Sequence, residues 1–248
     1  MTIETEDDVL ALKRIGSIVS RVLQQMLDAA EPGMTTRELD ALGARLLDQH
    51  GARSAPQLTY NFPGATCISI NEEAAHGIPG DRVMRAGDVL NVDVSAELDD
   101  YFADTGGTRV LPPTTPQKTR LCHATRTALA LAMKRARAGE PISGIGAAIE
   151  QTARNYGFKV IENLGSHGVG RALHEAPEHI PGYFDPKDRR LLSEGMVITI
   201  EPFLSTRSRI VTETDDGWTL VGAAGNLSAQ YEHTMIITRG EPIVVTRH

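Results

Sequence analysis

Two stretches of this chain match each other, AGDVLNVD at positions 86–93 and EGMVITIE at positions 194–201. In each stretch a glycine precedes a run of β-branched and apolar residues, which is typical of a strand buried on both faces. Each run ends on a carboxylate, Asp93 in the first and Glu201 in the second. A buried ionised carboxylate without a partner costs several kcal/mol or takes up a proton. We therefore expect a compensating cation beside both side chains.

A second carboxylate follows in each half of the chain, Asp104 in YFADT and Glu232 in QYEHTMII. A Glu-Pro dipeptide at position 31 also recurs at position 140, at nearly the same offset that separates Asp93 from Glu201. We interpret these repeats as an internal duplication within a single catalytic domain over 1–248, with halves at approximately 1–112 and 113–248. Two helix-helix-sheet halves related by a pseudo-two-fold axis would bring the four carboxylates face to face.

Hydrophobic periodicity and turn residues predict the secondary structure of both halves. Thr5 and Asp8 form a variant capping box before the first helix, and Thr35 with Glu38 caps the second. A hairpin turns around Asp99 and Asp100. The predicted elements are helices over 9–27, 35–51, 121–136 and 145–156, and strands over 67–71, 89–94, 101–110 and 159–162. The pattern is typical of an α+β fold with an antiparallel sheet.

Length and composition limit the classes of function. The 248 residues are 41% hydrophobic, enough for one compact unit, and the net charge of −7 argues against a nucleic-acid partner. The first residues lack a secretory pattern, and no apolar run approaches the ~20 residues that span a bilayer. We expect a cytoplasmic protein without a membrane partner. Cys67 and Cys122 are too isolated for a disulfide or zinc framework.

Three histidines accompany the acids: His76, His167 and His174. The first two precede glycines in segments that we expect to be loops, where the backbone can approach a ligand closely. Four carboxylates with one imidazole suit a pair of divalent first-row ions better than one closed zinc site. Such ions would support hydrolysis. Acid/base glycoside cleavage needs only two flanking acids, and the chain has neither a Gly-x-Ser-x-Gly elbow nor a P-loop lysine.

Seven motifs distributed over the whole chain resemble those of short bacterial type I methionine aminopeptidases, which have the pita-bread fold. They are CISINE at 67–72, HGIP at 76–79, NVDV at 91–94, ADT at 103–105, SHGVGR at 166–171, IEP at 200–202 and LSAQYEHT at 227–234. Two positions depart from the pattern of many relatives. Ser166 stands where glycine is common, and Leu173 stands where an aromatic residue precedes the second histidine. Neither departure removes a ligand, but Leu173 could reshape the substrate pocket.

The resemblance implies a complete set of site residues. It implies that two divalent ions, of cobalt, manganese, iron or zinc, are bound by Asp93, Asp104, His167, Glu201 and Glu232. It implies that Glu201 carries a proton to the leaving amine, His174 donates to the developing oxyanion, and His76 contacts the substrate near the scissile nitrogen. It further implies that the substrate side chain is bound by Tyr60, Phe62, Cys67, His76, His174 and Trp218.

The resemblance also implies the activity, the removal of the initiator methionine when the second residue is small. The partners would be N-termini of nascent polypeptides, at the ribosome or after release, and a monomer is the default expectation. Two alternatives stay open at this point. An Xaa-Pro aminopeptidase or dipeptidase shares this fold and ligand set, and a metal-free binding protein shares the fold alone.

Overall fold

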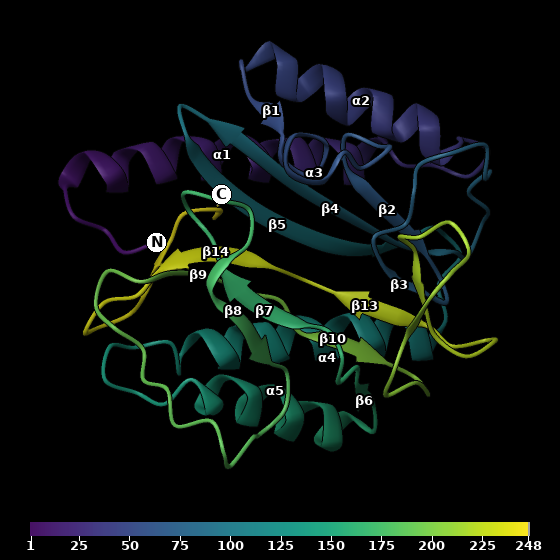
Figure 1. The fold of residues 1–248 in the computed structure, drawn as a ribbon. Helices are drawn as coiled ribbons and strands as arrows, with labels where there is room; N and C mark the ends of the chain where they lie inside the picture. Colours follow the sequence, from purple (N-terminus) through teal and green to yellow (C-terminus); the bar gives the residue numbers. More distant parts are fainter. Residues whose placement is uncertain (248) are drawn as a thin grey trace.

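Two pairs of long helices enclose a set of antiparallel strands in the computed structural model, which describes residues 1–247 (Figure 1). The helices are α1 (Glu6–Ala29), α2 (Thr36–Gln49), α3 (Ala55–Tyr60), α4 (Pro116–Met133) and α5 (Ser143–Tyr156). The strands of the first half are β1 (Arg53–Ser54), β2 (Cys67–Ile70), β3 (Glu73–Ala75), β4 (Val89–Leu98) and β5 (Tyr101–Val110). Those of the second half are β6 (Lys159–Val160), β7 (Gly165–Gly168), β8 (Glu175–Pro181), β9 (Val197–Ile200), β10 (Phe203–Ser205), β11 (Thr212–Glu213), β12 (Leu220–Val221), β13 (Ser228–Gln230), β14 (His233–Ile236) and β15 (Ile243–Val244).

Side-chain caps set the starts of the long helices. The predicted capping boxes are confirmed: Thr5 and Asp8 bond reciprocally at the start of α1, as Thr35 and Glu38 do at α2. The prediction for the third long helix was wrong at its start, because α4 begins at Pro116 rather than at position 121. A threonine directly before Pro116 accepts from the backbone N–H of the third helical residue, and proline is favoured in a first turn.

The first half is organised by the β4–β5 hairpin. Asp99 and Asp100 form its turn with φ of 53° and 63°, left-handed values that aspartate tolerates better than most residues. β4 extends beyond the predicted 89–94 because its ladder with β5 continues to the turn. β2 pairs antiparallel with β4 and sets Cys67 opposite Asp93. This sheet therefore carries two of the predicted acids on adjacent strands.

The second half holds its acids where strands are interrupted. β9 pairs with β14 and β10 pairs with β13, so Glu201 and Glu232 each lie between two short strands of a broken hairpin. The predicted strand over 159–162 is shorter, since β6 pairs with β10 over two residues only. The prediction that His167 lies in a loop was wrong. It lies in β7, whose ladder with β8 contains a register shift.

Each helix pair covers its own hydrophobic core. α1 and α2 pack on β2, β4 and β5, with Ile15, Leu39, Ile68 and Val92 fully or almost fully buried. α4 and α5 pack a second core on the strands of the other half, which includes Leu121, Ile145, Ile198 and Met235. In Figure 1 the strands therefore lie between a purple-blue and a teal helix pair. The internal duplication itself stays a prediction. None of the helices within residues 1–247 is long and apolar enough to cross a membrane.

Candidate metal centre and substrate pocket

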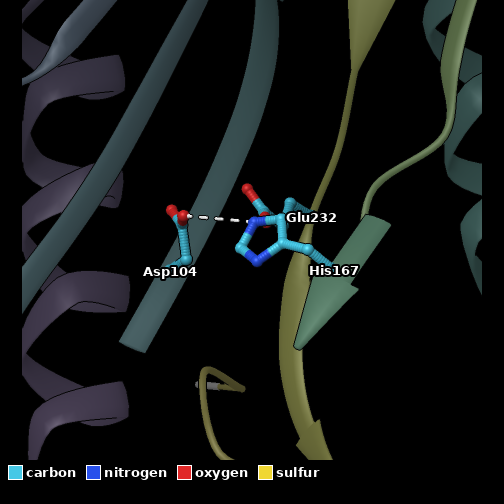
Figure 2. A group of neighbouring side chains, drawn as sticks. All are labelled: Asp104, His167 and Glu232. Atoms are coloured by element: carbon cyan, nitrogen blue, oxygen red, sulfur yellow. Dashed lines mark ion pairs between the residues drawn. The ribbon is translucent and has the colours of Figure 1, made fainter. Parts of the chain in front are cut away.

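Three predicted ligands from distant parts of the chain converge between the two halves. Asp104 lies on β5, His167 on β7, and Glu232 between β13 and β14. One ligand atom from each lies within 4.8 Å of the others (Figure 2). The three residues are only 6%, 5% and 1% exposed. The arrangement has the donor types and the spacing that a divalent cation requires.

The imidazole of His167 is oriented for ligation. Its Nδ1 lies 2.9 Å from the carbonyl oxygen of Gly168, which can only accept a hydrogen bond, so Nδ1 carries the proton. The lone pair is then on Nε2, which lies 3.4 Å from Glu201 Oε1 and 3.9 Å from Asp104 Oδ2. Such a backbone contact is the usual way to fix the tautomer of a metal-binding histidine.

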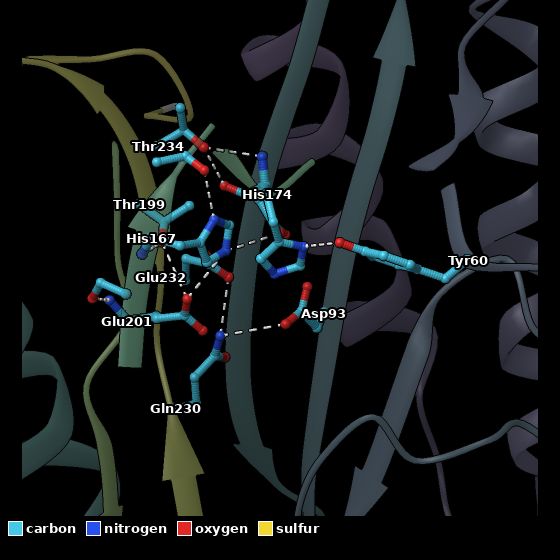
Figure 3. Close-up of polar contacts among 12 residues, drawn as sticks. Tyr60, Asp93, His167, His174, Thr199, Glu201, Gln230, Glu232 and Thr234 are labelled. Carbon is cyan, nitrogen blue, oxygen red and sulfur yellow. Dashed lines mark hydrogen bonds and ion pairs between the residues drawn. The ribbon is translucent and has the colours of Figure 1, made fainter. Parts of the chain in front are cut away.

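Glu201 and Asp93 lie at the edge of this group (Figure 3). The backbone N–H of Glu201 donates to Ser166 Oγ at 2.9 Å, so the serine that departs from the pattern of many relatives supports a predicted ligand. Thr199 Oγ1 donates to Glu201 Oε1 at 3.1 Å. Asp93, on β4, is partly buried and lies 3.5 Å from the side-chain amide of Gln230. All five predicted ligands thus lie in one region, although their roles stay predictions.

Sequence reasoning missed the residues that orient the acids. Gln230 donates to Glu232 Oε2 at 3.0 Å, and its own carbonyl accepts from Asn91 at 2.9 Å, which fixes the direction of the amide. Thr234 Oγ1 accepts from the backbone N–H of Asp104 at 3.0 Å. Gln230 and Thr234 each lie two positions from Glu232. That spacing was the available signal, because alternate residues of an extended chain share a face.

Burial and mutual repulsion shape the protonation of the site. Burial raises the pKa of Asp104 to about 6. Burial and the charge of Asp104 raise the pKa of Glu201 and of Glu232 well above the usual glutamate range. Burial and nearby His174 lower the pKa of His167 to about 3. Without a cation Glu201 and Glu232 therefore hold protons more readily than ordinary glutamates and the imidazole of His167 is neutral, and a bound metal ion would displace those protons.

Two buried oxygen atoms provide a direct test of whether a cation fits. Within residues 1–247, Asp104 Oδ1 and Glu232 Oε1 are buried and have no hydrogen-bond partner. Buried polar atoms are nearly always paired, so each unpaired atom calls for a partner. These two oxygens belong to two residues of the converging group, beside the free Nε2 of His167. The residues present fit a divalent cation.

A cavity of about 430 Å³ opens above the group and is lined by every predicted site residue except Glu232. Phe62 and Trp218 form part of its wall, with ring centroids 5.2 Å apart and an edge-to-face angle of 84°. Leu173 also lines the cavity and is almost fully buried. His76 lies just after β3, outside the strands as the sequence predicts, and has a left-handed backbone with φ of 56°. The cavity therefore combines an apolar wall with a polar floor.

Comparisons with known proteins agree with this geometry. Residues 11–239 match the model of metallopeptidase family M24. The chain is 48% identical over 248 residues to a methionine aminopeptidase from Staphylococcus epidermidis, covering 100% of this chain and 99% of the relative. The crystal structure of methionine aminopeptidase from Thermotoga maritima superposes with a TM-score of 0.95 at 32% identity, with full coverage of both chains. These matches confirm the predicted resemblance and fold class.

A prolidase from Pyrococcus furiosus shares the fold at greater distance. Its TM-score is 0.79 at 22% identity, and the match covers 100% of this chain but 66% of the prolidase. A likeness at that identity shows the fold alone. The comparisons therefore do not favour the Xaa-Pro peptidase or the metal-free binding protein that the sequence left open.

Proposed function

Because the chain belongs to metallopeptidase family M24, we propose that it removes the N-terminal methionine from peptides whose second residue is small. One observation carries the proposal. The buried acids and His167 meet at the floor of a cavity that an N-terminal side chain can enter. The natural substrates are N-termini of nascent polypeptides, which display the initiator methionine in the cytoplasm. The chain acts there as a monomer, at the ribosome or after release.

Five residues hold the cofactor in this proposal. Asp93, Asp104, His167, Glu201 and Glu232 would hold two divalent ions, and the unpaired oxygens of Asp104 and Glu232 support a cation at this place. When bound, the ions supply Lewis acidity that polarises the scissile carbonyl and activates water. Cobalt, manganese, iron and zinc all accept this donor set, so availability decides which is used.

Protein side chains supply the proton transfer and the contact to the oxyanion. Glu201 moves a proton toward the leaving amine, a role supported by its place at the cavity, where its Oε1 lies 3.4 Å from Nε2 of His167. Partial loss of hydration in the cavity and nearby His76 lower the pKa of His174 to about 4. A neutral His174 donates one hydrogen bond to the negative charge that develops on the carbonyl oxygen.

The apolar wall of the cavity favours a methionine side chain in the substrate. Phe62 is 4% exposed and packs edge-to-face on Trp218, so the two rings form a fixed apolar surface. The thiol of Cys67 borders the same cavity, and burial keeps its pKa well above the usual value. A flexible thioether fits such a surface and gains sulfur–aromatic contacts. His76 contacts the scissile nitrogen or the second residue in this proposal, and its exposed position in the lining of the cavity supports that role.

Peptide cleavage before and after metal removal tests the proposal. The chelated protein is assayed on Met-Ala-Ser, Met-Leu-Ser and an Ala-Pro peptide, then again with manganese or cobalt restored. We expect methionine release from the alanine peptide alone, and only with metal. Cleavage of the Ala-Pro peptide would favour the Xaa-Pro alternative. No cleavage of any peptide by metal-loaded protein would overturn the proposed function.

A further inference from the structure

A hydrogen bond at the rim of the cavity links two residues 114 positions apart. The hydroxyl of Tyr60 lies 2.7 Å from Nδ1 of His174, and the ring centroids are 5.6 Å apart. In Figure 3 the imidazole of His174 lies between that hydroxyl and the group of acids. Among residues 1–247, Tyr60 is the hydrogen-bond partner of this ring. The contact therefore controls the orientation of a side chain that borders the reacting atoms.

Local structure holds Tyr60 in place. It is the last residue of α3, and Asn61 ends that helix in a left-handed conformation with φ of 56°. The backbone N–H of Asn61 donates to the carbonyl of Gln57 at 3.1 Å, and the next N–H donates to Pro56 at 3.2 Å. These two hydrogen bonds terminate α3 directly after the residue that carries the phenol. Although Tyr60 is 44% exposed, its backbone is fixed at the helix end, and the contact with His174 holds its hydroxyl at the cavity.

The pair offers an arrangement in which the phenol donates and the imidazole accepts. Burial raises the pKa of Tyr60, so the phenol keeps its proton at neutral pH. That proton needs an acceptor, and Nδ1 of His174 lies at hydrogen-bond distance. A neutral imidazole that accepts on Nδ1 carries its own proton on Nε2. Nε2–H is then the donor that remains available to a substrate.

The neighbouring histidine shows the opposite arrangement. The rings of His167 and His174 lie 4.1 Å apart between centroids, yet their Nδ1 atoms face different partners. His167 faces a carbonyl oxygen, which can only accept. His174 faces a hydroxyl that can donate. When the phenol donates, the two adjacent imidazoles present Nε2 differently, one as a lone pair for ligation and the other as a hydrogen-bond donor.

From this geometry we propose that Tyr60 is a positioning residue that sets the tautomer and orientation of His174, rather than only a wall of the substrate pocket. The inference rests on the proposed function for its catalytic meaning. Tyr60 donates to Nδ1, and Nε2–H of His174 is directed to the scissile carbonyl oxygen. Removing the hydroxyl releases the ring to rotate and to exchange tautomers. We expect loss of the hydroxyl to slow the chemical step and to leave substrate binding unchanged.

The variant Tyr60→Phe tests this with two independent measurements. In steady-state cleavage of Met-Ala-Ser we expect kcat to fall about 10-fold while KM stays within about twofold, because an interaction of the transition state is weakened. In ¹⁵N spectra of the histidine rings, recorded without metal, we expect His174 to be the Nε2–H tautomer in the parent and a tautomer mixture in the variant. The His174 signals are assigned by their loss in His174→Gln.

A matched control exists elsewhere in the chain. The hydroxyl of Tyr156 lies 3.1 Å from Nε2 of His123 on the helices of the second half, with the rings 5.5 Å apart. Tyr156→Phe removes the same kind of bond outside the cavity. We expect it to leave kcat, KM and the His174 spectrum unchanged.

The kinetic result and the spectroscopic result can each overturn the proposed role of Tyr60. A raised KM with unchanged kcat in Tyr60→Phe would make Tyr60 a simple pocket wall and overturn the proposal. An identical His174 tautomer in parent and variant would overturn it as well. If the parent cleaves no methionine peptide, the proposed function fails, but the spectra still decide whether Tyr60 sets the tautomer.

Discussion

Replacing Asp104 with asparagine should stabilise the metal-free protein while it abolishes metal binding. Asp104 is 6% exposed, and its Oδ1 has no partner among the described residues. Asparagine has nearly the same shape and no charge. Its amide could also donate to a neighbouring carboxylate. The substitution therefore removes a buried charge whose loss of hydration a bound cation would offset.

The size of the effect follows from the raised pKa of this carboxyl. Its pKa is about 6 in the folded protein and 3.8 as the reference value. Because the folded value is the higher one, the carboxyl contributes its full stability below about pH 4 and loses it as pH rises through 6. The difference of about two units between the folded and the reference pKa lowers the free energy of unfolding by roughly 3 kcal/mol at pH 8. The uncharged amide of the Asp104→Asn variant carries no such loss.

Urea unfolding in EDTA at pH 4.5 and pH 8 measures this difference. Trp218 is the single tryptophan and lies at the cavity, so its fluorescence reports on unfolding. We expect Asp104→Asn to exceed the parent in unfolding free energy at pH 8 by about 1–3 kcal/mol, and to match it near pH 4.5. Asp48→Asn, at an exposed position, is the control and should show no such pH-dependent difference.

Metal addition completes the experiment. Manganese or cobalt at about 100 times its dissociation constant should stabilise the parent by roughly 3 kcal/mol and leave Asp104→Asn unchanged. If the variant is no more stable than the parent at pH 8 in EDTA, Asp104 is not under electrostatic strain, and the argument for a cation from its burial and charge is refuted.

Three further predictions concern other parts of the site. Glu201→Gln should lower the rate of methionine release at least ~100-fold, since it removes both a ligand and the proton carrier; turnover near that of the parent would contradict the assignment. Gly106→Ala would place a Cβ 2.2 Å from Oε1 of Gln230 and displace the amide that holds Glu232; calorimetry should show at least tenfold weaker metal binding, and an unchanged affinity would speak against this role of Gln230. Burial and a nearby arginine lower the pKa of His233 from 6.5 to about 4. As the pH falls, this histidine therefore binds a proton in the unfolded state before it does so in the folded state. The free energy of unfolding should fall by up to roughly 3 kcal/mol between pH 6.5 and pH 4. His233→Gln should reduce that fall in urea titrations, and an equal fall in both proteins would reject the idea.

The sequence alone determined several local features and predicted which residues carry the chemistry. The capping boxes at Thr5 and Thr35 and the turn at Asp99 are signals that span two to four residues, so no distant contact is needed to read them. Asp93 and Glu201 stood out because an acid inside an apolar strand requires a specific partner. The motif resemblance supplied the remaining site residues.

Only the tertiary structure decided how these residues act on one another. The bonds between Asp104 and Thr234, Asn91 and Gln230, and Tyr60 and His174 depend on strand register and on how two helix-covered halves meet. The placement of His167 in a strand also depends on pairing with β8 and β9. The bonds from Tyr60 to His174 and from Asn91 to Gln230 join positions more than a hundred residues apart, and the chain carries no local pattern for them. Their geometry is fixed by the packing of both cores together, so it emerges only when the whole fold has formed.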